Sequence, residues 1–262
     1  MPGTPLSANL RCGRRRMGDR CCDDDIPETD VSNATPPDRL PEKLPDDPMQ
    51  LASDWLDEAT AREVQRNPNA MALVTLGADH RPSARVVLCK SFVADPGYIV
   101  FYTNYQSRKG RDISANADVA LVFHWDALGR QVRIEGKAVF SPPAESDAYF
   151  HSRDWGSRLG AWGSDQSRPI ASRDALVAQI KARAAELGLP LEPDAANPAA
   201  GSPPEIPRPP HWGGFRVWAS SVELWVEGRD RIHDRAVWTR ELAPADENEF
   251  APTAWVGTRL QP

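Results

Sequence analysis

The chain has 262 residues, of which 40% are hydrophobic and 26% charged, a composition typical of a globular protein. Its formal net charge of -6 argues against non-specific binding to nucleic acid, because such binding needs a basic surface. No run of about 18 apolar residues occurs, and no apolar run follows the basic N-terminal residues, so we expect neither a membrane span nor a secretory signal.

The cysteine pattern indicates free thiols rather than disulfides or a metal centre. Cys12, Cys21 and Cys22 lie in a polar stretch and Cys89 lies in an apolar run. No Cys-x-x-Cys pair and no Cys/His cluster at zinc spacing is present, so we expect no bound metal. The interpretation is a protein of the reducing cytoplasm, with a redox role for the adjacent pair Cys21–Cys22 as the less favoured alternative.

The first 46 residues have the composition of a disordered tail. They are rich in Pro, Asp, Arg and Ser and contain few large apolar side chains. Such a segment buries too little surface to offset the entropy lost on ordering. We expect a tail at 1–46 and leave open whether translation starts at Met1 or Met17.

A helix is predicted directly after the tail, beginning near Asp47. Leu51, Trp55 and Leu56 recur at helical spacing and give it one apolar face. The helix is expected to end before Asn67-Pro68, because the residue before a proline avoids the helical region.

The next part of the chain has the pattern of short antiparallel strands. Runs rich in Val, Ile, Phe and Tyr are separated by turn residues, and most gaps are too short for a crossover helix. An antiparallel barrel or sandwich is therefore predicted, with a helix at 107–116 between its strands. The predicted strands are 70–76, 85–90, 98–103, 119–125 and 131–140.

Helices and a proline-rich segment precede the last strands. Residues 188–210 hold eight prolines and are predicted to form an extended surface loop. Together with the strands these elements make one folded domain, 47–262. The predicted helices are 143–152, 158–162 and 170–187, and the predicted late strands are 215–219, 222–226, 231–239 and 255–259.

Common cofactor and catalytic motifs are absent from the sequence. It contains no Gly-x-Gly-x-x-Gly after a strand, no P-loop, no His-Glu-x-x-His and no Gly-x-Ser-x-Gly. Ser107-Arg108-Lys109 instead opens a predicted helix, where free N–H groups and two cations favour a phosphate. Taken alone, these residues favour the interpretation of an ordinary solvated helix start.

Arg85 and Lys90 stand at the two ends of an apolar strand. Their odd spacing places them on opposite faces of a regular strand, so they can serve one ligand only through a bulge or at the strand end. The alternative is a strand with solvated charged ends.

Arg231, His233 and Arg235 alternate along a predicted strand and therefore share one face. Three potential cations in a row need an anion, and arginine suits phosphate or carboxylate. Trp225 on the preceding strand could pack a ring system. The alternative is an exposed face balanced by Asp234.

Tyr149 and Arg153 are four residues apart and so are neighbours on a predicted helix. With Ser157, Gln166 and Ser167 nearby in sequence, they could hold a phosphate monoester. A structural role in the core is the alternative for this region.

Taken together, these segments resemble the pyridoxine (pyridoxamine) 5′-phosphate oxidase family from about Pro45 to the C-terminus. The matching segments occur in the same order as in that family, so chance similarity is a poor explanation. They are Arg85-Val-Val-Leu-Cys-Lys90, Phe101-Tyr-Thr-Asn104 with Ser107-Arg-Lys109, Arg130-Gln-Val132, Tyr149-Phe-His-Ser-Arg153, Gly160-Ala-Trp162 with Gln166-Ser167, Trp212-Gly-Gly-Phe-Arg216 and Arg231-Ile-His-Asp-Arg235.

The resemblance implies a mainly β protein with peripheral helices, an antiparallel FMN-binding split β-barrel of Greek-key type. It implies a homodimer with FMN at the subunit interface, no nucleic-acid partner and no membrane. Implied FMN contacts are Arg85, Lys90, Tyr102, Thr103, Arg108, Lys109, Gln131, Gln166, Ser167, Trp225 and Arg235. Implied substrate contacts are Lys90, Tyr149, Arg153 and Ser157 at the phosphate, with Arg231 and His233 as catalytic residues over the substrate ring.

The implied reaction is oxidation of pyridoxine or pyridoxamine 5′-phosphate to pyridoxal 5′-phosphate, with O2 as acceptor and H2O2 as product. The alternatives are an FMN-dependent oxidase of another ring compound, such as a phenazine precursor, and a binding protein for FMN or pyridoxal phosphate without turnover. Asn67, where the family often has Asp, keeps the last alternative open.

Overall fold

The computed structural model describes residues 39–192 and 205–262. The expectations for Cys12, Cys21, Cys22, Met17 and most of the tail lie outside these residues, as does the middle of the proline-rich loop. Within the described ranges, no helix is both long and apolar enough to cross a membrane.

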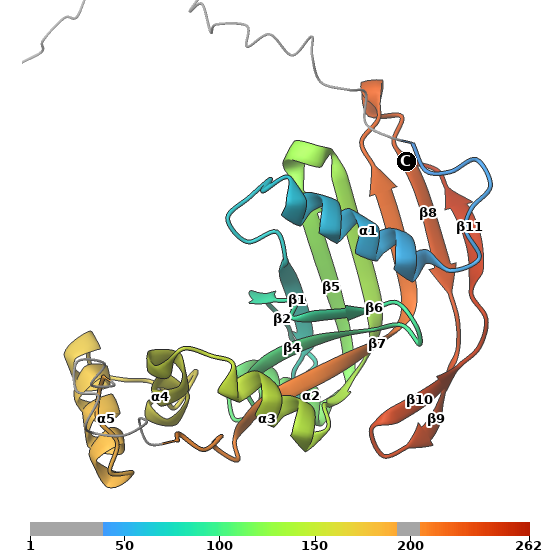
Figure 1. Cartoon of the computed structure of the whole chain (residues 1–262). Helices are drawn as coiled ribbons and strands as arrows, with labels where there is room; N and C mark the ends of the chain where they lie inside the picture. Colours follow the sequence, from blue (N-terminus) through green and yellow to red (C-terminus); the bar gives the residue numbers. More distant parts are fainter. Residues whose placement is uncertain (1–38, 193–204) are drawn as a thin grey trace, which may run out of the picture. The chain divides into compact units, whose positions relative to one another are not determined.

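The first helix, α1 (Pro48–Ala61), forms because its ends and its apolar face are both specified locally. Asp47 caps it by accepting a hydrogen bond from Met49 N at 2.7 Å, and Pro48 occupies the first turn. Its buried face lies on the sheet, which α1 crosses in Figure 1. The helix ends well before Asn67-Pro68.

A curled antiparallel sheet forms the body of the protein, as predicted, with its strands in the order β11-β8-β7-β6-β5-β1-β2. A further strand, β4, pairs with β7 and carries the short β3 at its other edge. The strand bounds are β1 Ala70–Leu76, β2 Pro82–Leu88, β3 Ser91–Val93, β4 Tyr98–Asn104, β5 Asp118–Trp125, β6 Arg130–Phe140, β7 Trp212–Val226, β8 Asp234–Thr239 and β11 Val256–Leu260.

Strand β7 makes the sheet curl into a half-barrel. It is one strand of 15 residues, whereas the sequence predicted two strands, because its polar middle at Ser220-Ser221 resembles a turn. Its first half pairs with β4 and its second half pairs with β8, and the register to β6 shifts at Glu135/Gly136. A single bent strand thus joins two parts of the sheet.

The hydrophobic core lies between α1 and the concave face of the sheet. The central strands contribute fully buried side chains to it, among them Leu73, Phe101, Phe123 and Leu224. Helix α2 (Arg108–Ala115) closes one end of the core through Ile113. The fold is therefore mainly β with peripheral helices, as predicted.

A second, smaller cluster of buried residues joins the helices after β6. Its members are Phe150, Leu159, Ala184, Ile206 and Trp212. The helices are α3 (Pro143–His151), α4 (Trp155–Gly163) and α5 (Arg173–Glu186). Helix α5 starts three residues later than predicted, because Ser172 caps it and accepts a hydrogen bond from Ala175 N at 3.0 Å.

The C-terminal part contains a hairpin that the sequence did not predict. Strands β9 (Leu242–Asp246) and β10 (Glu249–Pro252) pair only with each other among the described strands. Pro244 and Pro252 obscure the strand pattern, because proline is tolerated only at such edges.

Residues 39–46 lie against the sheet, where the sequence predicted the end of a tail. Leu40 is buried, and its N–H donates to Asp234 Oδ2 at 3.0 Å. Trp238 Nε1 donates to the Pro45 carbonyl at 2.8 Å. These partners are almost 200 residues away in sequence, so composition alone does not reveal them.

Candidate functional site

A cavity of about 290 Å³ collects most of the candidate residues from the first two thirds of the chain. It lies where the end of β2, the end of β4, the start of α2 and helix α3 meet the start of β7. Its lining residues are Val86, Val87, Leu88, Lys90, Tyr102, Thr103, Asn104, Lys109, Tyr149, Arg153, Gln166 and Trp212.

Lys90 reaches this cavity because β2 ends at Leu88, two residues earlier than predicted. The chain turns there, and Lys90 N donates to the Val100 carbonyl of β4 at 2.8 Å. Lys90 therefore lies beyond the strand that carries Arg85, and the two side chains are not restricted to opposite faces of one strand. Lys90 Nζ lies 5.7 Å from the centre of the Tyr149 ring.

Lys109 is the central cation at one end of the cavity. Its Nζ donates to Thr103 Oγ1 at 2.9 Å and to Gln166 Oε1 at 2.7 Å, both neutral groups. Burial, assisted by the charge of Arg85, lowers the pKa of Lys109 to about 8. Since no carboxylate pairs with it among the described residues, this ammonium is suited to an anionic ligand.

Arg85 and Arg108 lie beside this end of the cavity but do not line it. Arg85 Nη1 donates to Thr75 Oγ1 at 2.7 Å, and Arg85 Nη2 lies 3.6 Å from Asp112 Oδ2. Arg108 Nε lies 4.0 Å from the same oxygen. Burial lowers the pKa of Arg85, the charge of Asp112 opposes this, and the charge of Arg108 adds to it. Three cations thus gather around the first turn of α2.

Ser107 caps that helix, as predicted, by accepting a hydrogen bond from Gly110 N at 3.3 Å. The helix N-terminus and three basic side chains therefore lie together, which favours a phosphate group.

The other end of the cavity has an aromatic wall and one more arginine. Tyr102 stacks on Tyr149 with 3.9 Å between ring centres and on Trp212 with 5.7 Å. Arg153 Cζ lies 4.6 Å from the centre of the Trp212 ring. Burial lowers the pKa of Arg153, and its Nη1 atom is buried without a hydrogen-bond partner in the described part of the chain. A buried donor without a partner is costly, so this atom indicates a place for a ligand oxygen.

Two further candidates, Ser157 and Ser167, are not among the residues that line this cavity. Ser157 is exposed in the first turn of α4. Ser167 follows Gln166 and has φ 70°, so the chain turns sharply there. Asn67 is exposed and is not among the lining residues of the cavity.

The remaining candidates form a second cluster on β6, β7 and β8. Gln131, Trp225 and Arg235 are directly opposite one another in the strand registers and so form one row across the sheet. Arg235 donates to Glu223 Oε1 from Nε at 2.9 Å and from Nη2 at 2.7 Å. The His233 ring lies 4.6 Å from that of Trp225, and Gly228 N donates to His233 Nδ1 at 3.2 Å.

The expected strand at 231–239 begins only at Asp234, so the expected common face of Arg231, His233 and Arg235 is wrong. Arg231 lies in a short 3-10 turn, Arg229–Arg231, with φ 64°, and Asp230 before it has φ 57°. These left-handed residues interrupt the strand. Arg235 is balanced by Glu223, an acidic neighbour on β7.

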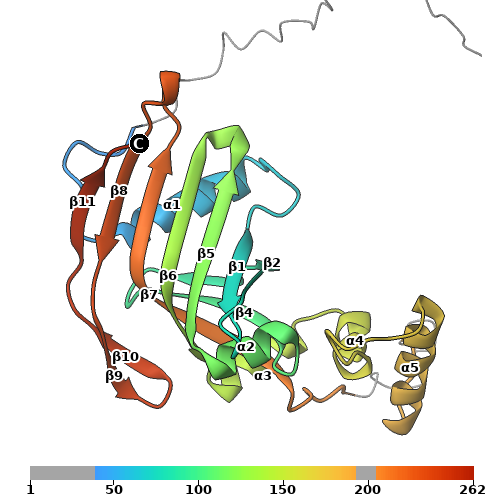
Figure 2. The ribbon, with the colours of Figure 1, turned by 180° about the vertical axis from the view of Figure 1, so that it is seen from behind.

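The two clusters lie at opposite ends of β7. Trp212 of the cavity and Trp225 of the second cluster are thirteen residues apart on this strand, which is roughly 43 Å of extended chain. Figures 1 and 2 agree that the turn before β8 and the helices α2 and α3 lie at opposite ends of the sheet. One chain therefore does not bring all the candidates together.

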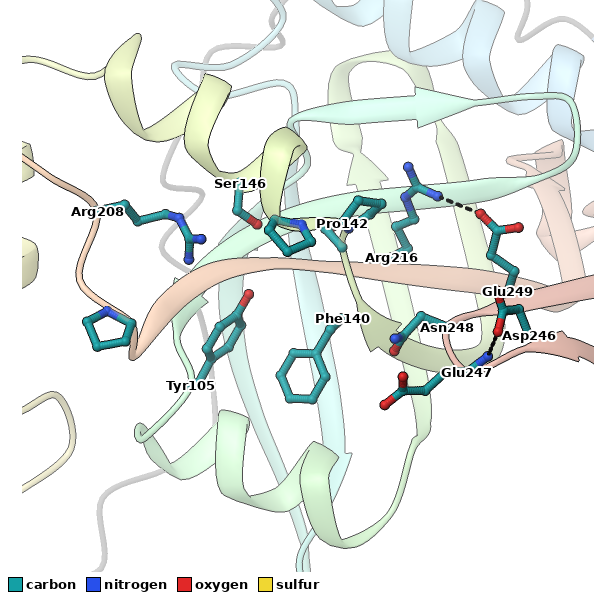
Figure 3. Close-up of a pocket in the computed structure, with 13 residues that line it drawn as sticks. Tyr105, Phe140, Pro142, Ser146, Arg208, Arg216, Asp246, Glu247, Asn248 and Glu249 are labelled. Atoms are coloured by element: carbon teal, nitrogen blue, oxygen red, sulfur yellow. Dashed lines mark hydrogen bonds and ion pairs between the residues drawn. The ribbon is translucent and has the colours of Figure 1, made fainter.

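A larger cavity, of about 520 Å³, lies between α3, β7 and the β9–β10 hairpin (Figure 3). Its two arginines already have partners: Arg216 Nε lies 3.0 Å from Glu145 Oε2, and Arg208 Nε lies 2.6 Å from Asp147 Oδ1. The hairpin adds further acidic groups at the rim. None of the residues singled out from the sequence as site candidates lines it, so the smaller, cationic cavity is the better site.

Several residues of the two clusters were not predicted from the sequence to have a functional role. They are Thr75, Asp112, Trp212 and Glu223. Asp112 had a local signal, because it lies four residues after Arg108 on a helix. Thr75 and Glu223 had none, because their partners are on other strands. Within the described residues, no group of His, Cys, Asp or Glu is arranged to hold a metal.

These features define an antiparallel half-barrel protein with a cationic, aromatic-walled cavity suited to an anionic ligand. The sequence matches the model of the family described as pyridoxamine 5′-phosphate oxidase over residues 56–185. It also matches the model of the pyridoxine 5′-phosphate oxidase C-terminal dimerisation region over residues 212–262.

Similar proteins agree with these matches. A pyridoxine/pyridoxamine 5′-phosphate oxidase of Burkholderia multivorans is 45% identical over 216 residues, 82% of this chain and 89% of the relative. One of Chromobacterium violaceum is 50% identical over 196 residues, 75% of this chain and 83% of the relative. The chain therefore belongs to the pyridoxine/pyridoxamine 5′-phosphate oxidase family.

Solved structures support the predicted split-barrel fold. PhzG from Burkholderia lata, in complex with tetrahydrophenazine-1-carboxylic acid, superposes with a TM-score of 0.67 at 30% identity, covering 83% of this chain and 94% of PhzG. A pyridoxamine 5′-phosphate oxidase-related, FMN binding protein from Nostoc punctiforme gives a TM-score of 0.54 at 17% identity and covers 78% of this chain and 96% of its own, which shows the fold alone.

Proposed function

We propose that this chain is an FMN-dependent oxidase that converts pyridoxine and pyridoxamine 5′-phosphate to pyridoxal 5′-phosphate, with O2 as acceptor and H2O2 as product. The observation that carries this proposal is the cationic cavity, in which Lys90, Lys109 and Arg153 converge with no carboxylate among its lining residues. The names of the relatives support the same reaction.

The residues at the α2 end of the cavity fit the phosphate of FMN. Lys109 has neutral hydrogen-bond partners, Thr103, Ser107 and Gln166, and no acidic partner among the described residues. Arg85 and Arg108 lie alongside. Together they would neutralise a phosphate dianion beside a helix N-terminus. When bound, FMN would accept a hydride from C4′ of the substrate and pass the electrons to O2.

The residues at the α3 end of the cavity fit the phosphate of the substrate. The buried Arg153 Nη1 has no partner among the described residues, and Lys90 lies at the Tyr149 ring. We assign Lys90, Tyr149 and Arg153 to this phosphate, with Ser157 approaching from α4. Binding would supply the acceptor that Arg153 Nη1 lacks.

The second cluster completes the site from another copy of the chain. In a two-fold dimer, a contact between the cavity of one copy and the second cluster of its partner is repeated by the symmetry, so two equal sites would form. The match to a dimerisation region over residues 212–262 supports this arrangement, because it contains β7, β8 and β11. The partner's row of Gln131, Trp225 and Arg235 would then hold the flavin.

Arg231 and His233 are assigned to the substrate ring in this arrangement. Arg231 is exposed and makes no ion pair with another described residue, so its guanidinium is free to align a substrate and to stabilise charge. His233 is held by Trp225 and Gly228, which fixes its ring near the same place. Whether it transfers a proton or only orients the ring depends on its distance to the substrate.

We infer a cytoplasmic location as part of this proposal. Cys89 is buried and free, and burial raises the pKa of its thiol to about 12. A free cysteine is typical of proteins in a reducing compartment. Burial makes this thiol unreactive, so we assign it a structural role.

The likeness to PhzG favours one alternative, oxidation of a phenazine precursor. The test supplies purified protein and O2 with pyridoxine 5′-phosphate, unphosphorylated pyridoxine or tetrahydrophenazine-1-carboxylic acid, and measures H2O2 and the oxidised product. The proposal expects turnover of the phosphorylated substrate and little turnover of pyridoxine, because pyridoxine lacks the phosphate that Arg153 is proposed to bind. Turnover of the phenazine compound alone would favour the alternative, and stoichiometric binding without H2O2 would indicate a binding protein.

A further inference from the structure

Asp112 is an acidic side chain where the proposed function needs cations. It lies on α2, is only 9% exposed, and is within reach of both Arg85 and Arg108. A carboxylate so close to a phosphate site opposes the binding of an anion by simple Coulomb repulsion. Its presence there therefore needs a reason.

The contacts of Asp112 give that reason. Its Oδ2 accepts a hydrogen bond from Thr75 Oγ1 at 2.7 Å, and the same hydroxyl accepts one from Arg85 Nη1 at 2.7 Å. The carboxylate also lies 3.6 Å from Arg85 Nη2 and 4.0 Å from Arg108 Nε. Strand β1, strand β2 and helix α2 are thus joined by one buried polar network.

This network fixes the position of a long, flexible side chain. Arg85 donates in addition to Ser83 Oγ at 2.9 Å and to the Leu73 carbonyl at 3.2 Å, so its guanidinium is held from several sides. Without Asp112, three cations would lie together with no opposing charge, and Arg85 and Arg108 would repel each other and Lys109. The carboxylate lets them stay together before a ligand arrives.

We propose that Asp112, through Thr75, is a positioning residue that holds Arg85 and Arg108 ready for the phosphate of FMN. The inference rests on the proposed function, because it assumes that this end of the cavity receives that phosphate. In this proposal Asp112 acts through the two arginines and not by contacting the phosphate. Its effect on binding is the net of two opposite effects: preorganisation of the two arginines strengthens phosphate binding, and its own charge weakens it.

The two effects predict opposite results for Asp112→Asn, which keeps the shape of the side chain and removes its charge. If positioning dominates, the Kd for FMN rises by about tenfold or more, the size of one charge-assisted hydrogen bond. If repulsion dominates, FMN binds more tightly. The Kd is measured by quenching of flavin fluorescence on titration of the flavin-free protein.

Riboflavin, which lacks the phosphate, separates positioning from general damage. The proposal expects Asp112→Asn to weaken FMN binding and to leave riboflavin binding unchanged, and Asp112→Glu to restore most of the affinity for FMN. Thr75→Val, which removes the bridging hydroxyl, should weaken FMN in the same selective way and replaces Asp112→Asn if that variant does not fold. Asp118→Asn is the matched control, because Asp118 is exposed and Lys137 is its only ion-pair partner in the described part of the chain.

Each result has a defined meaning. Unchanged or tighter FMN binding by Asp112→Asn overturns the positioning role, as does equal weakening of FMN and riboflavin. Failure of the wild-type protein to bind FMN at all contradicts the proposed function, and the inference with it. Wild-type binding with an unaffected Asp112→Asn variant contradicts this inference alone.

Discussion

Two variants of this protein that are nearly inactive at a substrate concentration well below the wild-type KM should regain activity there when they are mixed. Arg153→Ala removes the arginine of the cavity whose Nη1 atom has no hydrogen-bond partner among the described residues, and Arg231→Ala removes the exposed arginine of the turn before β8. The two positions belong to clusters at opposite ends of β7, separated along the strand by roughly 43 Å. If each site takes one cluster from each copy, the two substitutions damage different contributions to the same site.

The size of the recovery follows from the symmetry of the dimer. After unfolding and refolding of an equal mixture, about half of the dimers are mixed. In each mixed dimer one site carries both substitutions and the other carries neither, so about a quarter of the wild-type activity returns. The assay is H2O2 release from pyridoxine 5′-phosphate at a fixed total protein concentration.

A control mixture distinguishes this recovery from a general effect of refolding. Lys90→Ala and Arg153→Ala both alter the same cavity, so every site of their mixed dimers carries one substitution and activity stays low. If the cross-cluster mixture is no more active than this control, the composite site is refuted. Equal recovery in both mixtures would refute it as well.

Three further outcomes are expected. Arg231→Ala should lower turnover by about a hundredfold while leaving the Kd for FMN almost unchanged, and an equal loss of both would contradict the role of Arg231. Arg153→Ala should raise the KM for the phosphorylated substrate by about tenfold to a hundredfold, and an unchanged KM would remove Arg153 from the substrate site. The affinity for FMN should fall as the pH rises through about 8, because burial lowers the pKa of Lys109 in the flavin-free protein and its positive charge is lost there. Lys109→Arg should move that fall to higher pH, and titration of flavin fluorescence across pH would show a flat profile if Lys109 is not involved.

The strands could be predicted where local pattern and tertiary environment agree. Strands β1 and β5 alternate buried and half-exposed or exposed residues, so their apolar pattern reports the core face directly. The pattern fails in β7, which is buried along most of its length and carries a polar middle. There the decision between one strand and two depends on pairing with β4 and β8, which are distant in sequence.

The cavity could be predicted in part, because several of its lining residues, such as Lys90 and Lys109, belong to short motifs that are visible in the sequence. The start of helix α2 is predicted from Ser107, Arg108 and Lys109, and the structure confirms that Ser107 caps it. The common strand predicted for Arg231, His233 and Arg235 is wrong, because Asp230 and Arg231 adopt left-handed backbone angles. The alternating pattern of the side chains does not reveal this backbone conformation. Partners such as Thr75 and Glu223 become visible only when strands are placed side by side.

The most direct test of the central claim is the visible spectrum of the purified protein before and after anaerobic addition of pyridoxine 5′-phosphate. The account predicts a yellow protein whose absorbance near the flavin band bleaches with this substrate and recovers in air. It also predicts that unphosphorylated pyridoxine bleaches the protein far more slowly. A yellow protein that stays yellow with pyridoxine 5′-phosphate, or a colourless protein that does not bind FMN, would contradict the account.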